Sequence, residues 1–200
     1  MDKKMTFLCL VRHGETEWNL LRKIQGRTDI PLNNNGKNQA LDCKRYLSSL
    51  QWDLIVSSPL KRATQTADII NESMNLPYLI MDDFIERNYG SIEGLTLEQR
   101  ENLNPDFQCP AQEKRDVLIS RVIAGMNQLH QQYKNKRIIV VAHGGVINSI
   151  LSFLSEGALG SGKTRLYNGG LTYIQFQDGK WHIKDYNQTT HISRNQLNIK

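Results

Sequence analysis

Two short apolar runs, far apart in the sequence, end in the same two residues, and this feature restricts the fold more than any other. Residues 7–14 read FLCLVRHG, and residues 137–144 read RIIVVAHG. Continuous apolar runs of this length, without helical spacing, are typical of strands that are buried on both faces of a parallel sheet. His13 and His143 would then follow directly on two buried strands. In open α/β sheets, ligands bind at the carboxyl ends of the strands.

The rest of the chain alternates between strand-like and helix-like segments. Apolar residues recur at three- and four-residue steps in the predicted helices, which lie within residues 31–50, 58–74, 118–133 and 145–154. Further strands are predicted at residues 52–58 and 78–84, and residues 171–187 read as a hairpin that turns at Asp178-Gly179. This alternation predicts an α/β sandwich with a mostly parallel central sheet and an antiparallel edge hairpin.

The helix predicted at residues 58–74 carries an independent indication of a ligand. Ser58 is the expected N-cap and Pro59 the expected first helical residue. Arg62 then falls in the first turn, where the helix dipole disfavours a cation. Because helix N-termini and arginine side chains both bind phosphate well, the position of Arg62 predicts an anion close to it.

Four strand ends therefore bring chemically active side chains to one edge of the predicted sheet. These side chains are Arg12, His13, Arg62, Glu86 and His143. Gly14 and Gly144 follow the two histidines, and we expect them to let the backbone approach a ligand closely. The apolar runs are thus interpreted as sheet core, and the abrupt polar residues as its functional edge.

Composition restricts the class of protein. The 200 residues, 39% of them hydrophobic and 22% charged, suit one soluble domain spanning residues 1–200. Three dispersed cysteines and the absence of a signal-peptide pattern predict a cytoplasmic location, and no apolar run is long enough for a bilayer. The net charge of +5 comes without a basic run interleaved with aromatics, so nucleic acid is disfavoured and a small anionic substrate is favoured. The sequence leaves open whether the chain forms a homodimer.

Two other readings of the motifs are weaker. The two histidines together with Glu86 would make a metal triad, but neighbouring arginines repel a divalent cation and clustered carboxylates are missing, so we predict neither a metal nor a cofactor. Residues 157–164 read GALGSGKT and satisfy the P-loop pattern. That motif needs a strand before it and a helix after it, whereas here a helical pattern precedes and a strand pattern follows. We therefore expect a Gly/Ser loop.

Five segments, in order, resemble the histidine phosphatase superfamily, which is also called phosphoglycerate mutase-like. They are LVRHGETEWN (10–19), QGRTDIPLNNNG (25–36), SSPLKRATQTA (57–67), ERNYGSIEG (86–94) and VVAHGGVI (140–147). The resemblance covers nearly the whole chain and is nearest to the bacillus-type phosphatases of the family. It implies a three-layer α/β/α sandwich with a small cap region at about residues 87–116.

The resemblance also implies roles for individual residues. His13 would be the nucleophile that becomes phosphohistidine, and Glu86 would protonate the leaving alcohol and then activate water. The expected ligands of the phosphoryl group are Arg12, Arg62, His143, Gly144, the amide of Asn19 and the segment Gln25-Gly26. The implied partner is a small phosphorylated substrate.

Three functions are compatible with these residues. The first is a metal-independent phosphatase for small phosphomonoesters. The second is a phosphoglycerate mutase, which returns the phosphoryl group to the substrate; the resemblance disfavours it, because mutases carry a longer basic insertion than residues 87–142 provide. The third is a non-catalytic protein that binds a phosphorylated ligand, which the presence of both a nucleophile and an acid disfavours.

Overall fold

The computed structural model describes residues 5–103, 109 and 111–197, and within them the chain forms one six-stranded sheet. The strands are β1 (Thr6–Arg12), β2 (Leu54–Ser57), β3 (Tyr78–Ile80), β4 (Arg137–Ala142), β5 (Leu171–Gln177) and β6 (Lys180–Gln188). Their order is β3-β2-β4-β1-β5-β6. β1 to β4 run parallel, β5 runs antiparallel to β1, and β6 antiparallel to β5. The mostly parallel sheet with an antiparallel edge hairpin is confirmed.

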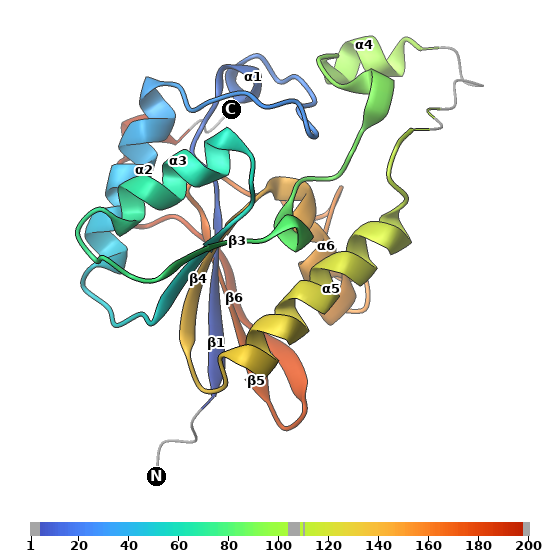
Figure 1. Cartoon of the computed structure of the whole chain (residues 1–200). Coiled ribbons are helices and arrows are strands. Elements are labelled where there is room, and N and C mark those ends of the chain that lie inside the picture. The colour runs from blue at the N-terminus through green and yellow to red at the C-terminus, as the bar shows by residue number, and fades with distance from the viewer. Residues whose placement is uncertain (1–4, 104–108, 110, 198–200) are drawn as a thin grey trace.

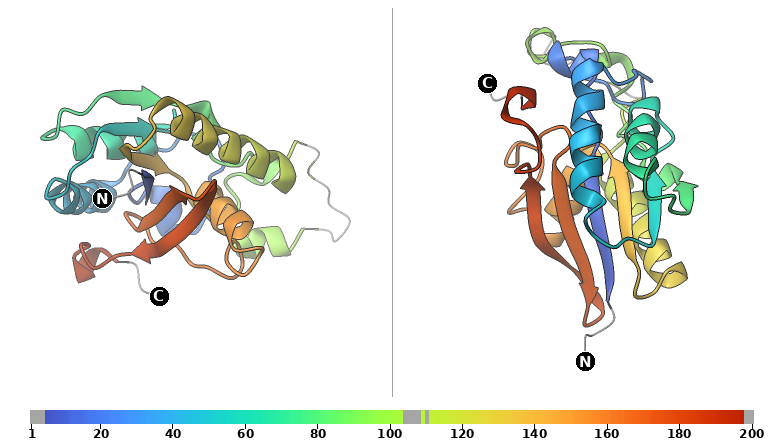
Figure 2. Two further views of the ribbon diagram at one scale, coloured as in Figure 1. Left: turned by 90° about the horizontal axis from the view of Figure 1, so that it is seen from below. Right: turned by 90° about the vertical axis from the view of Figure 1, so that its left-hand side faces the viewer.

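Helices cover both faces of the sheet, which confirms the three-layer arrangement (Figures 1 and 2). On one face lie α2 (Asn34–Leu47) and α3 (Lys61–Asn71), and on the other lie α5 (Arg115–Gln132) and α6 (Gly144–Leu154). Successive side chains of a strand point to opposite faces. Leu8 and Leu10 of β1 therefore pack with α5 and α6, whereas Cys9 and Val11 pack with α2 and α3.

The register of the two central strands brings the two His-Gly segments together. β1 pairs with β4 so that Arg12 lies opposite Ala142, one residue before each histidine. The His13 backbone N–H also donates to the Ala142 carbonyl at 3.0 Å. The side chains that follow these strands consequently start from adjacent positions at the carboxyl edge of the sheet.

Two boundaries differ from the sequence prediction. The helix predicted to start at Ser58 and Pro59 begins at Lys61, with Leu60 as an N-cap that makes no side-chain bond. The Ser58 hydroxyl is hydrogen-bonded to His143 and also accepts from Leu60 N–H at 3.3 Å, just before the helix, and not from the first turn of α3. The strand predicted at 78–84 ends at Ile80, and Asp82–Phe84 form a 3-10 turn.

The cap is a short excursion above the carboxyl edge of the sheet. It contains a 3-10 turn (Gly90–Ile92) and α4 (Leu97–Glu101), and Figure 1 shows α4 and α1 (Glu17–Leu20) above the same end of the sheet. Backbone hydrogen bonds join the segments: Ile24 N–H donates to the Leu95 carbonyl at 2.9 Å, and Gly94 N–H donates to the Ile24 carbonyl at 2.8 Å. Residues 104–108 and 110 of the predicted cap lie outside the described residues.

The remaining segments of the described chain carry no catalytic signature. The P-loop look-alike at 157–164 forms turns that follow α6, and no helix starts after it, as expected for a loop. A last 3-10 turn covers Arg194–Gln196. Across the described residues, no helix has both the length and the apolar character that a membrane crossing requires.

Candidate active site

The carboxyl edge of the sheet contains a cavity of about 260 Å³, which we call the phosphate cavity after the phosphorylated ligand that the sequence predicts here. Its walls include eight of the nine predicted site residues, namely Arg12, His13, Asn19, Gln25, Gly26, Arg62, Glu86 and Gly144. The ninth, His143, lies behind this wall with its ring centroid 5.2 Å from that of His13. The structure therefore brings together all the residues that the sequence placed at this edge.

His13 is held in one orientation by its own loop. The ring is 3% exposed, and its Nδ1–H donates to the Gly14 carbonyl at 2.7 Å. The loop is fixed in turn, because Gly14 N–H donates to Thr66 Oγ1 at 3.0 Å and Asn168 Nδ2 donates to the His13 carbonyl at 2.9 Å. With the proton on Nδ1, the Nε2 atom keeps its lone pair.

The environment of His13 keeps the imidazole neutral. Burial lowers the pKa of His13 well below its usual value, and the positive charges of Arg62 and Arg12 lower it further. The hydrogen bond to Gly14 acts in the opposite direction and is the weakest of these influences. A neutral imidazole with a free Nε2 is the form that a nucleophilic histidine requires.

Arg62 is fully buried, and a neighbouring loop holds it. Nη1 donates to the Thr28 carbonyl at 2.9 Å, and Nη2 donates to the Gly26 carbonyl at 2.6 Å. These two carbonyls partly offset the unfavourable interaction between the Arg62 cation and the N-terminal end of the α3 dipole. The sequence argument did not predict these two contacts. The Nε atom of Arg62 bonds to neither carbonyl; it is buried and has no hydrogen-bond partner.

Arg12 is likewise anchored at one end and unpartnered at the other. Nη1 donates to the Leu166 carbonyl, whereas Nε is buried without a partner. Burial is the main reason that the pKa of Arg12 is lowered to about 10, and the carboxylate of Glu86 opposes this shift. The guanidinium therefore stays charged at neutral pH.

His143 is buried and bonded on only one side. Nε2 lies 2.7 Å from Ser58 Oγ, and Nδ1 has no partner. Burial, followed by the charge of Arg62, lowers the pKa of His143 well below its usual value. When the Ser58 hydroxyl donates to Nε2, the neutral ring carries its proton on Nδ1 and can donate it.

Unpartnered polar atoms are thus concentrated at this site. Buried side-chain atoms normally find partners, because an unsatisfied group costs roughly 1–3 kcal/mol. Three donors in the described residues lack one here: Arg12 Nε, Arg62 Nε and His143 Nδ1. Since two of the donors are cationic, the group that would satisfy all three is an oxyanion.

Glu86 follows the 3-10 turn Asp82–Phe84 and lies in the wall of the phosphate cavity, where its carboxylate contacts the first turn of α6. It is 8% exposed, and its two carboxylate oxygens accept from Arg87 N–H at 2.7 Å and from Gly145 N–H at 2.9 Å. Its backbone carbonyl accepts from Arg27 and Arg121, which also fixes the loop. A carboxyl group is therefore positioned at the cavity wall, within a protected environment.

Gly145, which the sequence reading did not single out, determines where this carboxylate can lie. A Cβ atom added at Gly145 would fall 2.4 Å from Glu86 Oε1. We expect Gly145→Ala to displace the Glu86 carboxylate and to lower kcat for alkyl phosphates strongly. The melting temperature should stay near the wild-type value or fall slightly, because the roughly 1 kcal/mol by which alanine favours a helix over glycine is offset by the contact with Glu86.

The matched variant is Gly144→Ala, where the added Cβ would lie 3.5 Å from Arg12 Nε, an ordinary contact. Steady-state rates on glycerol phosphate and thermal denaturation of both variants make the comparison. Because Gly144 lies in the same cavity wall beside Arg12, a loss in Gly144→Ala should be similar for glycerol phosphate and p-nitrophenyl phosphate, whereas Gly145→Ala should slow glycerol phosphate more. Equal slowing of both substrates in Gly145→Ala would show that this variant does not act through Glu86.

Asn19 and Gly26 lie in the cavity wall for identifiable local reasons. The Asn19 Oδ1 atom accepts from Thr16 in the capping box of α1, which leaves the Nδ2 amide to donate. Gly26 has a φ of +54°, and an added Cβ would collide with Glu93. Gln25 is 9% exposed, and its Oε1 atom has no partner.

Gly14 has a packing role that the sequence did not predict. An added Cβ there would lie 2.3 Å from the Gly36 carbonyl of α2, so close packing between two backbones requires a glycine at this position. At Gly144, as noted, the contact with Arg12 would be ordinary.

Sequence reasoning missed several residues of the site. Lys23, Ile24, Tyr89 and Arg100 complete the cavity wall together with Gly145. Arg100 and Tyr89 come from the cap, where the Thr96–Gln99 capping box indicates a helix start but nothing in the pattern indicates that these two side chains reach the cavity. Asn168 also went unnoticed, although the Tyr-Asn-Gly-Gly turn before β5 could have drawn attention to it.

The side chains at this edge are poor ligands for a divalent cation. In residues 5–103, 109 and 111–197, no three His, Cys, Asp or Glu side chains are grouped so that they could hold a metal ion. The charged groups nearest His13 are arginines, which bind oxyanions and repel cations.

Comparisons with known proteins agree with this geometry. The chain is 49% identical over 189 residues to the "Uncharacterized phosphatase PhoE" of Bacillus subtilis, covering 94% of this chain and 98% of that protein. It is 32% identical over 189 residues to the "Probable phosphoglycerate mutase GpmB" of Proteus mirabilis, covering 88% of each chain.

Among solved structures, a mutant phosphoserine phosphatase from Entamoeba histolytica, in complex with phosphoserine, superposes with a TM-score of 0.82. Its sequence is 33% identical, and the match covers 94% of this chain and all of that one. The sequence profile of the histidine phosphatase superfamily (branch 1) matches residues 8–189. From fold, site and sequence together, the chain belongs to the histidine phosphatase superfamily.

Proposed function

We propose that the protein hydrolyses small phosphomonoesters without a metal ion, by way of a phosphohistidine at His13. The observation that carries this proposal is the orientation of His13. Its Nδ1–H is fixed on the Gly14 carbonyl, so Nε2 is a neutral nucleophile in a cavity with unpartnered donors from Arg12, Arg62 and His143. The relatives named as phosphatases support the same reaction class.

In the first step, Nε2 of His13 attacks phosphorus in line with the bond to the leaving oxygen. The N–P bond forms, the P–O bond breaks, and the proton of the Glu86 carboxyl passes to the departing alkoxide. Negative charge spreads over the three equatorial oxygens during this step. Arg12 Nε, Arg62 Nε and His143 Nδ1 would stabilise it, because they are fixed before the reaction starts.

In the second step, a water molecule attacks the phosphohistidine. Glu86, now a carboxylate, accepts a proton from the water as the O–P bond forms and the N–P bond breaks. Inorganic phosphate leaves, and His13 and the Glu86 carboxyl return to their starting states. One carboxyl group thus serves as acid and then as base, which balances the protons over the cycle.

The assay for this function is phosphate release from p-nitrophenyl phosphate in the presence of EDTA. Turnover that EDTA does not reduce supports the proposal, and turnover that requires an added divalent cation contradicts it. Phosphoglycerates, sugar phosphates and nucleotides, assayed for hydrolysis and isomerisation together, separate a phosphatase from a mutase. Isomerisation faster than hydrolysis would favour the mutase.

Loss of the buried Arg62 donor should be costly. We expect Arg62→Ala to lower kcat/KM by on the order of 10²-fold or more, as loss of one preorganised oxyanion donor does. Arg62→Lys keeps the charge and fills the buried site, so it tests whether the fork of the guanidinium is required. Circular dichroism verifies that both variants fold.

Lys163→Ala is the control for removal of a positive charge. Lys163 is exposed in the P-loop look-alike and bonds to the Gly157 carbonyl, so its loss should leave kcat/KM near the wild-type value. If Arg62→Ala is as active as Lys163→Ala, Arg62 does not bind the phosphoryl group.

A further inference from the structure

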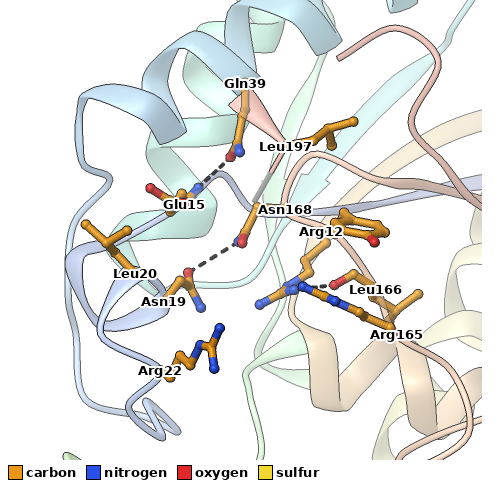
Figure 3. Close-up of a pocket in the computed structure, with 11 residues that line it drawn as sticks. Arg12, Glu15, Asn19, Leu20, Arg22, Gln39, Arg165, Leu166, Asn168 and Leu197 are labelled. Atoms are coloured by element: carbon orange, nitrogen blue, oxygen red, sulfur yellow. Dashed lines mark hydrogen bonds between the residues drawn. The ribbon is translucent and has the colours of Figure 1, made fainter. Parts of the chain in front are cut away.

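A second cavity, of about 340 Å³, opens beside the phosphate cavity (Figure 3). We call it the lateral pocket and define it by Arg12, Asn19, Leu20, Arg22, Arg165 and Leu197. Arg12 and Asn19 line both cavities. A molecule in the phosphate cavity and one in the lateral pocket would therefore share two donors in a common wall.

Three of the four charged side chains that line the lateral pocket are arginines. Figure 3 shows the guanidinium groups of Arg12 and Arg22 and the amide of Asn19 turned toward one space. Arg165 lines the pocket near Arg12, and its positive charge contributes to the lowered pKa of Arg12. The acidic residue of the wall is Glu15, which is 3% exposed and already accepts from Asn33 Nδ2 at 2.8 Å. Converging donors of one sign favour an anion between them.

The local backbone holds the two outer arginines at this pocket. Arg22 has a φ of +53°, a left-handed conformation that is unfavourable for a residue with a side chain. It is imposed by the turn after α1, in which Arg22 N–H donates to the Asn19 carbonyl at 3.1 Å. Arg165 lies over the ring of Tyr167, 5.0 Å from its centroid, and its carbonyl accepts from Asn187 Nδ2 at 2.9 Å.

We propose that the lateral pocket binds a second oxyanion, a carboxylate or a phosphate, at Arg22 and Arg165. This inference rests on the proposed function, since the first anion is the phosphoryl group beside His13. The second anion has two possible sources. It is either another acidic group of the same substrate, which makes phosphorylated acids and bisphosphates the preferred substrates, or a separate inorganic phosphate. Leu20 and Leu197 would contact carbon atoms that join the two groups of one substrate.

The first arm of the test compares 3-phosphoglycerate with glycerol 3-phosphate, which differ by a carboxylate in place of a hydroxymethyl group. The variants are Arg22→Gln and Arg165→Gln. The control is Lys180→Gln, an exposed charge at the start of β6, at the end of the sheet opposite α1 (Figure 1). If the second anion belongs to the substrate, each arginine variant lowers the kcat/KM ratio of the acid to the alcohol on the order of tenfold, the usual effect of losing a charged hydrogen bond. The control leaves that ratio unchanged.

The second arm measures inorganic phosphate binding by titration calorimetry. If free phosphate is the occupant, the wild-type protein binds two phosphates and Arg22→Gln binds one. Either a ratio change or a second phosphate site that Arg22→Gln removes supports the lateral pocket, and a second site that Arg22→Gln retains, with an unchanged ratio, counts against it. The inference is overturned when the ratio is the same in every variant and all proteins bind a single phosphate. If the inference fails in this way while both substrates are still hydrolysed, the proposed function is unaffected. Two bound phosphates without any hydrolysis would overturn the function and keep the pocket.

Discussion

Replacement of His13 by alanine should abolish turnover while leaving the phosphate cavity able to bind its ligand. His13 is the one side chain in the cavity wall that presents an imidazole nitrogen with a lone pair, because His143 lies behind it and is bonded to Ser58. Removal of a covalent nucleophile costs on the order of 10⁶ in kcat in well-studied hydrolases. The remaining donors of Arg12 and Arg62 should still hold inorganic phosphate.

The direct measurement is capture of the phosphoenzyme. Rapid quenching of the wild-type protein with a labelled monoester should trap a phosphate that is stable in base and lost in acid, as expected of phosphohistidine. His13→Ala should trap none. The control is His182→Ala, because His182 lies in β6, away from the phosphate cavity, and should keep the label. Activity of His13→Ala within about 10²-fold of wild type, or a label that survives acid, would show that another group is the nucleophile.

The sheet and its functional edge were predictable because their signals are local. An apolar run such as residues 138–142 cannot be satisfied outside a core, and a polar group directly after it must lie where the strand ends. The inference that Arg62 lies in the first turn of its helix likewise depends only on where that helix starts, within three residues of Arg62. These inferences needed no knowledge of what packs against what.

The interactions that refine the site could not be predicted in the same way, because they join residues far apart in sequence. Ser58 reads as a helix cap, yet the helix starts three residues later, and the Ser58 hydroxyl bonds to His143 and to the Leu60 N–H. Gly145 is restricted by Glu86 across the cavity, and no property of the segment around either residue signals that contact. Arg22 is an exposed residue, and nothing around it in the sequence indicates that the turn after α1 directs its side chain toward the lateral pocket.

The second large effect is expected at Glu86, and it should depend on the leaving group. An alkyl phosphate releases a basic alkoxide, which needs a proton as the P–O bond breaks. p-Nitrophenolate is a good leaving group and does not. General acid catalysis contributes typically 10²–10⁴-fold. We therefore expect Glu86→Gln to slow phosphorylation of His13 strongly with glycerol 3-phosphate and only weakly with p-nitrophenyl phosphate.

Steady-state rates cannot isolate this effect, because the same carboxyl group also activates water in the second step. The pre-steady-state burst of product isolates the first step and is the measurement to make. Asp82→Asn is the matched control, because Asp82 is exposed on the 3-10 turn that precedes Glu86. It should leave both bursts close to those of the wild-type protein.

Equal slowing of the burst with both substrates would remove Glu86 as the proton donor. Glu93 is then a poor replacement, because its two carboxylate oxygens already accept from the backbone of Arg27, Thr28 and Tyr89 and from the Thr28 hydroxyl. Asp83, which is partly buried beside Gly125 of α5, would be the next candidate to mutate. Slowing with glycerol 3-phosphate alone would instead identify Glu86 as the proton donor. The absence of a side chain at Gly145 is then what leaves room for this carboxylate beside the phosphoryl group.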